Sequence, residues 1–195
     1  MIEYNSQRDN HTFRGKFRAW WQCFATSSWM FLSWYVPEIK GSDDRGLAQY
    51  LDNTEDSIGK RGLGEKIKKK FNWITGHTTY WWLVHKYAIE AYMWRGGVKG
   101  TCIFQDYDIT FEQMNMLLES GPVIFQTKKM GGLKGGHIIL ILEYVGGSYI
   151  VMDPFGDATT HYQDSDGGYK KYPDWFLKKY CGNKYGKVRC LWWKK

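Results

Sequence analysis

Long apolar segments are absent from this sequence. No stretch approaches about eighteen consecutive uncharged apolar residues, so we expect no transmembrane helix. The first ten residues, MIEYNSQRDN, contain no apolar core of a signal peptide. We therefore expect synthesis in a cytoplasm, and delivery by some other means if the protein acts outside it.

Cysteine pairs with metal-site or redox spacing are also absent. The four cysteines lie at positions 23, 102, 181 and 190, and no two are separated by two residues. Cys181 and Cys190 would suit a disulfide in an oxidising compartment, but without a signal peptide the reduced, partly buried state is favoured. His77 and His85 have no acidic or cysteine partner at ligand spacing. We predict neither a metal site nor a cofactor.

Three short motifs begin binding patterns that they do not complete. The glycine loop GGLKGG, residues 131–136, lacks the Gly-Lys-Ser/Thr ending of a phosphate loop. The stretch DSDGG, residues 164–168, lacks the glycine and glutamate positions of a calcium loop, so it predicts a polar turn. The basic run KIKKK, residues 66–70, fits contact with nucleic acid or an anionic polymer, although a solvated helix face is favoured.

The composition is that of a globular domain with an excess of positive charge. The 195 residues are 43% hydrophobic and 24% charged, which fits one domain with a sizeable core. The formal net charge of +7 favours anionic partners such as nucleic acid, wall polymers or a membrane surface. Charge alone does not choose among these partners.

Helical patterns occupy the first part of the chain. The sequence predicts helices over residues 23–35, 78–94 and 108–121. Thr78 or Thr79 is expected to cap the second helix. Thr110 is expected to cap the third, and Gln113, three residues later, completes a capping box.

Strand patterns follow in the C-terminal part. Runs of β-branched and aromatic residues are joined by glycine turns, and they cover residues 122–127, 137–145, 148–153 and 187–193. Helices followed by an antiparallel sheet predict an α+β architecture.

A cysteine stands where the first predicted helix begins. At that position Cys23 would face unpaired backbone N–H groups and the positive end of the helix dipole. Both stabilise a thiolate relative to a thiol, and the thiolate is the reactive nucleophile. A small buried side chain that happens to begin a helix would explain the position equally well, so other residues must decide.

A histidine and an aspartate on one predicted hairpin favour the reactive interpretation. His137 begins one strand and Asp153 ends the next, and a tight Gly146-Gly147 turn joins the two strands. In an antiparallel pair these positions lie at the same end, so a carboxylate can orient the imidazole. A thiolate hydrolase needs such an imidazole to move its proton, and a group to hold the imidazole.

These residues together resemble the papain-like cysteine peptidases, in particular the branch related to bacteriocin leader peptidases, which includes phage and bacterial stand-alone domains. The matching segments are NSQRDN with QCFATSSWM, then GPVIFQTKKMGGLKGGHIILILEY, then YIVMDPFGD. The resemblance implies one papain-like domain over residues 1–195, with the cysteine helix packed on the C-terminal sheet. Residues 38–107 match little of the family and are expected to form a helical elaboration.

The resemblance also implies catalytic roles. Cys23 would be the nucleophile, His137 the general base and acid, and Asp153 the residue that orients the imidazole. Gln7 would supply an oxyanion-hole amide beside the backbone N–H of Cys23; Gln22 is a rival because it adjoins the cysteine. Two features depart from the family: the inserted HTFRGKFRAW before the cysteine, and a phenylalanine where leader peptidases usually have glycine. A weaker candidate for the base is His161.

The expected substrate is a peptide or amide bond in peptidoglycan. A small basic hydrolase without a signal peptide fits a phage-type endolysin or virion-associated endopeptidase, released to the wall with its basic surface aiding contact with anionic wall polymers. One alternative is a protease that processes a protein or leader peptide. Another is an inactive papain-like binding module, which predicts an unreactive Cys23. A nucleic-acid binder is disfavoured because it leaves the Cys, His and Asp pattern unexplained.

Overall fold

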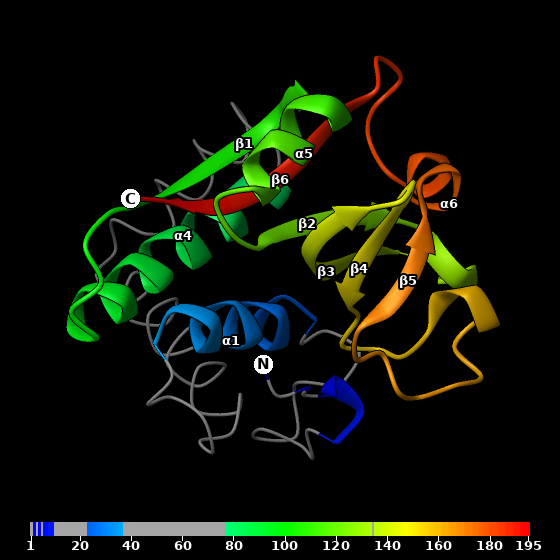
Figure 1. The fold of residues 1–195 in the computed structure, drawn as a ribbon, viewed down its shortest axis with the longest axis horizontal. Helices are drawn as coiled ribbons and strands as arrows, with labels where there is room; N and C mark the ends of the chain where they lie inside the picture. The colour runs from blue at the N-terminus through cyan, green and yellow to red at the C-terminus, as the bar shows by residue number, and fades with distance from the viewer. Residues whose placement is uncertain (1, 3, 5, 10–22, 37–76, 134) are drawn as a thin grey trace.

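The computed structural model describes residues 2, 4, 6–9, 23–36, 77–133 and 135–195. In this part of the chain, helices cover both faces of one antiparallel sheet (Figure 1). The α-helices are α1 (Cys23–Tyr35), α4 (His77–Arg95), α5 (Phe111–Leu118) and α6 (Asp174–Tyr180). Short 3-10 helices are η1 (Gln7–Asp9), η4 (Met130–Gly132) and η5 (Ala158–Thr160).

The sheet has six strands in the order β1-β6-β2-β3-β4-β5, and every neighbouring pair is antiparallel. The strands are β1 (Thr101–Thr110), β2 (Val123–Lys128), β3 (Gly136–Val145), β4 (Ser148–Met152), β5 (Lys170–Pro173) and β6 (Lys187–Lys194). The four predicted strands agree with β2, β3, β4 and β6 to within one residue at each end. A helix packed on an antiparallel sheet confirms the α+β class.

The central strand β3 is buried on both faces. Ile138, Leu140 and Leu142 join the core that α1 and α4 cover. Ile139 and Ile141 point the other way, into a second core with α5 and α6. Burial on both sides explains why the strand is a continuous apolar run rather than an alternating one. Each such aliphatic side chain contributes about 1.5–3 kcal/mol to stability.

Helix α1 is enclosed on nearly every side. All residues from Cys23 to Ser33 are buried, and the helix packs against β2, β3 and α4 (Figure 1). A helix that is apolar around its whole circumference is typical of such a central position. The Ser27 hydroxyl donates to the backbone oxygen of Ile138 at 3.1 Å, which ties the helix to the strand that carries His137.

The helix boundaries correct two expectations. Helix α4 begins at His77, so Thr78 and Thr79 lie inside it rather than at its cap. Helix α5 begins at Phe111, with both halves of the predicted Thr110–Gln113 capping box present. An N-cap residue has extended rather than helical backbone angles, so Thr110 can end the strand β1, and the residues before it lie in that strand. The predicted helix over 108–121 therefore began too early.

We expected a helical elaboration over residues 38–107, but the end of this segment is a strand. Residues 101–107 lie in β1, which pairs with β6 at one edge of the sheet. The strand was missed because its register shifts between Asp106 and Ile109, and because Tyr107 there has a positive φ of 63°. Helices and strands therefore alternate in the chain instead of following one another in two blocks. Residues 38–76, including KIKKK, lie outside the described residues.

Candidate active site

Cys23 is the first residue of α1, as the sequence indicated. Its side chain is 9% exposed. The backbone N–H groups in the first turn of a helix have no acceptor within that helix, so they create a positive potential around the thiol. This is the local environment in which a thiolate is stabilised.

His137 and Asp153 meet at the open end of the β3–β4 hairpin. The imidazole Nε2 of His137 lies 2.6 Å from Oδ1 of Asp153, and both side chains are buried. The predicted proximity of these two residues is confirmed. The hairpin explains it, because β3 begins next to His137 and β4 ends one residue before Asp153.

The Asp153 carboxylate is surrounded by hydrogen-bond donors. Besides His137, Oδ1 accepts from the backbone N–H of Phe155 at 3.0 Å. Oδ2 accepts from the hydroxyl of Tyr172 at 3.0 Å and from that of Tyr162 at 3.4 Å. A fully buried carboxylate needs such donors to replace the water it has lost. The four donors hold it in one orientation toward the imidazole.

The charge on Asp153 determines the ionisation of His137. Burial by itself lowers the pKa of the imidazole, but the adjacent carboxylate and a hydrogen bond with Cys23 outweigh it and raise that pKa to about 10. The charged imidazolium is therefore the favoured form of His137 in the folded protein.

Aromatic rings fix the imidazole from the sides. Phe155 and Tyr162 contact His137 edge-to-face, with ring centroids 6.2 Å and 6.0 Å from that of the imidazole. The guanidinium of Arg8 lies 4.3 Å from the centre of the Phe155 ring and donates to the backbone oxygen of Tyr162 at 3.0 Å. The N-terminal segment therefore braces the rings that hold His137.

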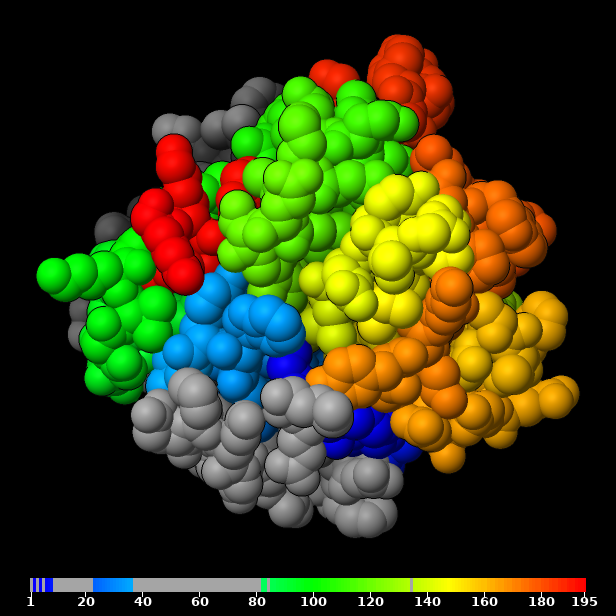
Figure 2. Space-filling model, viewed as in Figure 1, coloured from blue at the N-terminus to red at the C-terminus, as the bar shows by residue number. Residues whose placement is uncertain are grey.

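Gln7 is buried beside the residues that follow Asp153. Its backbone N–H donates to the backbone oxygen of Pro154 at 2.8 Å. Figure 2 shows η1, in blue, against the gold and orange residues after β4. Gln22 lies outside the described residues, so the preference for Gln7 stays a prediction.

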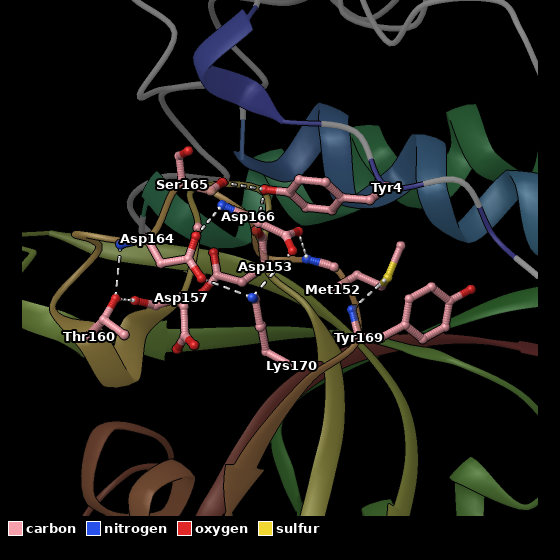
Figure 3. A network of polar contacts seen from close by, with 12 residues as sticks. Tyr4, Met152, Asp153, Asp157, Thr160, Asp164, Ser165, Asp166, Tyr169 and Lys170 are labelled. Carbon is pink, nitrogen blue, oxygen red and sulfur yellow. Dashed lines mark hydrogen bonds and ion pairs between the residues drawn. The ribbon is translucent and has the colours of Figure 1, made fainter.

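The predicted polar turn, residues 164–168, lies next to Asp153 (Figure 3). Lys170 pairs with the carboxylates of Asp164 and Asp166 at 3.0 Å and 3.3 Å. The backbone oxygen of Gly167 accepts from the N–H of Asp153 at 2.9 Å. A Cβ at residue 167 would lie 1.9 Å from the backbone oxygen of Asp153, so only glycine allows this approach. The turn thus supports the end of β4.

His161 and His85 form no hydrogen bond or ion pair with Asp153. His161 is exposed and has a left-handed backbone at the end of η5. His85 is buried in α4, stacks on Phe24 at 3.5 Å and bonds to the Ser28 hydroxyl at 3.2 Å. Burial lowers the pKa of His85 to about 3, so it is a neutral core residue.

Cysteines outside the site are unpaired thiols. Cys102, Cys181 and Cys190 are free and buried. Burial raises the pKa of all three. These three thiols are therefore protonated at neutral pH.

Sequence reasoning missed the tyrosines on Asp153. Tyr172 comes from β5 and Tyr162 from the loop before it, so no local motif connects either to the aspartate.

No helix of the described residues has the length and apolarity needed to cross a membrane. Within the same residues, no three His, Cys, Asp or Glu side chains group as metal ligands would. No family model, curated protein or solved structure matches this chain.

Proposed function

We propose that this protein is a cysteine hydrolase with a papain-like fold, related to the bacteriocin leader peptidases. The observation that carries the proposal is the buried 2.6 Å contact between His137 and Asp153. Cys23, at a helix N-terminus, is also among the groups that raise the pKa of the imidazole. The chain order of Gln7, Cys23, His137 and Asp153 agrees with that family.

Each group has one role in the proposed reaction. The Cys23 thiolate attacks the carbonyl carbon of a peptide or amide bond, and the backbone N–H of Cys23 and the Gln7 amide stabilise the oxyanion. The His137 imidazolium gives its proton to the leaving nitrogen as the C–N bond breaks, which leaves a thioester. Water then attacks the thioester, His137 takes its proton, and the C–S bond breaks to release the acid. Asp153 keeps the imidazole oriented and compensates its charge.

Peptidoglycan is the proposed substrate, cleaved at the bacterial wall by a phage-type enzyme. The positive charge supports this, since wall polymers are anionic. The last part of the chain, residues 168–195, contains one acidic residue, Asp174, and nine basic ones, namely Lys170, Lys171, Lys178, Lys179, Lys184, Lys187, Arg189, Lys194 and Lys195. Lys178, Lys179 and Lys184 are exposed. The exposed lysines of this segment would hold the enzyme near anionic wall polymers, and the contact should weaken as salt is added.

The test is digestion of purified sacculi by the wild type and by Cys23→Ala, with released fragments identified by mass spectrometry. Stem-peptide fragments from the wild type alone would support both mechanism and substrate. Rapid iodoacetamide labelling of Cys23 at neutral pH without any fragment would direct attention to a protein or leader peptide as substrate. An inert Cys23 would indicate a binding module, and would overturn the proposed mechanism.

A further inference from the structure

Two buried tyrosines approach the side of Asp153 that faces away from His137. Tyr172 is fully buried on the edge strand β5, and its hydroxyl lies 3.0 Å from Oδ2. Tyr162 is buried in the preceding loop, and its hydroxyl lies 3.4 Å from the same oxygen. The proposed reaction gives neither tyrosine a role, because neither is bonded to the sulfur or to the imidazole nitrogens.

The direction of the Tyr172 hydrogen bond is determined by a third group. The backbone N–H of Ala158 donates to the Tyr172 hydroxyl at 2.8 Å, so it occupies a lone pair of that oxygen. A hydroxyl has a single proton to donate. The backbone oxygen of Gly156 lies farther away, at 3.4 Å, whereas Oδ2 of Asp153 lies at 3.0 Å. The hydroxyl proton therefore goes to the carboxylate.

We infer that Tyr172 is a positioning residue for the Cys23–His137–Asp153 relay, and that its hydroxyl sets the pH range in which Cys23 is reactive. The inference rests on the proposed function. The positive end of the O–H dipole offsets part of the carboxylate charge that His137 and Cys23 experience. Without this dipole, the same carboxylate would hold the imidazolium proton more tightly and would oppose the thiolate more strongly.

The groups that face Asp153 permit this effect to be isolated. They are His137 from β3, Tyr172 from β5 and Tyr162 from the loop, with Cys23 of α1 beyond the imidazole. The Tyr4 hydroxyl donates to the backbone oxygens of Asp153 and Ser165 and not to the Asp153 carboxylate (Figure 3). Among the described residues, no Lys or Arg forms an ion pair with this carboxylate. Burial and the charge on Asp153 raise the pKa of Tyr172, so it keeps its proton throughout the assay range.

The test measures the rate of Cys23 alkylation by iodoacetamide against pH, with the labelled peptide identified by mass spectrometry. The reactive range is limited at low pH by loss of the Cys23 proton and at high pH by loss of the His137 proton. In Tyr172→Phe, both limits should move to higher pH, by on the order of half a unit. Tyr149→Phe is the matched control. Tyr149 is the cross-strand partner of Tyr172, is equally buried, and has its hydroxyl near Asp174 instead of Asp153. This control should keep the wild-type limits.

A second variant guards against misfolding. Tyr162→Phe removes the longer of the two hydrogen bonds, so it should shift the limits in the same direction by less. If Tyr172→Phe does not fold, the comparison of Tyr162→Phe with Tyr149→Phe decides whether a tyrosine hydroxyl on Asp153 sets the pH limits of Cys23 alkylation. A slower reaction with unchanged limits would show a structural role only and overturn the inference. A wild-type Cys23 that does not react at any pH would instead overturn the proposed function.

Discussion

Two buried histidines lie beside the cysteine helix, and their ionisation is opposite. The pKa of His137 is raised to about 10 by Asp153 and, to a smaller extent, by Cys23, the first residue of α1. His85 stacks on Phe24, the next residue of the same helix, and its pKa is lowered to about 3. The extent of burial does not distinguish them, since both rings are almost inaccessible to water.

The partner group accounts for the difference. His137 has a carboxylate within 2.6 Å, whereas His85 has a neutral serine hydroxyl at 3.2 Å and an aromatic ring. Removal from water penalises both imidazolium ions, and only an adjacent negative charge compensates the penalty. A buried histidine is therefore a cation in one region and a neutral packing element in the other. The predictions below alter one partner at a time.

The largest effect should come from Asp153→Asn, which gives His137 a neutral partner like that of His85. We expect the rate of Cys23 alkylation at neutral pH to fall on the order of a hundredfold or more, because the imidazolium loses its compensating charge. Iodoacetamide kinetics measure this change. Asp174→Asn is the control, because Asp174, at the start of α6, pairs with Lys178 instead of a histidine. An unchanged rate in Asp153→Asn would contradict the assigned role of the carboxylate.

The two histidines should also impose opposite pH dependences on the free energy of unfolding. The unfolded chain protonates His85 near pH 6.5, but the folded protein does so only near 3. Its contribution is complete above pH 6.5 and declines as the pH falls toward 3, by on the order of 4 kcal/mol. The contribution of His137 is complete below pH 6.5 and declines as the pH rises through about 10.

Urea unfolding across this pH range tests the comparison through His85→Gln. This variant should lose less stability than the wild type between pH 6.5 and 4, although it is less stable at pH 7. Equal slopes for the two proteins in the acid range would show that His85 is already charged in the folded state.

A smaller effect is expected from Ser28→Ala. The substitution leaves Nδ1 of the buried His85 ring without its hydroxyl partner, at a cost of about 1–3 kcal/mol. Ser33→Ala is the matched control in the same helix, because its hydroxyl bonds only to the backbone oxygen of Trp29, one turn earlier. Thermal or urea unfolding at pH 7 should rank Ser28→Ala as the less stable variant. The reverse order would mean that the Ser28–His85 contact contributes little.

The smallest effect should come from His161→Gln, which tests the exposed histidine that the sequence left as an alternative base. Its ring is exposed and lies outside the hydrogen-bond network of Asp153. We expect a change in stability within about 0.5 kcal/mol and unchanged alkylation of Cys23. A large loss of Cys23 reactivity would reopen the assignment of the base to His137.

Local patterns were enough to predict the positions of Cys23, His137 and Asp153. The side-chain pattern of residues 23–35 predicted the helix that begins at Cys23, and the glycine turn between β3 and β4 brought the other two residues to one end of a hairpin. Strand β1 escaped prediction because a bulge at Tyr107 interrupts its alternation. Strand β5, only four residues long, offered too short a pattern to identify.

The sequence by itself determined the chemistry within reach of short-range geometry: a thiol at a helix terminus, and an imidazole and a carboxylate on one hairpin. Only the tertiary structure decided how those groups ionise. Tyr172 reaches Asp153 across 19 residues of chain, and His85 reaches Ser28 across 57. The pKa of a buried group depends on the charges and donors within a few ångströms of it, and those neighbours come from segments that only the packing of the sheet and helices brings together.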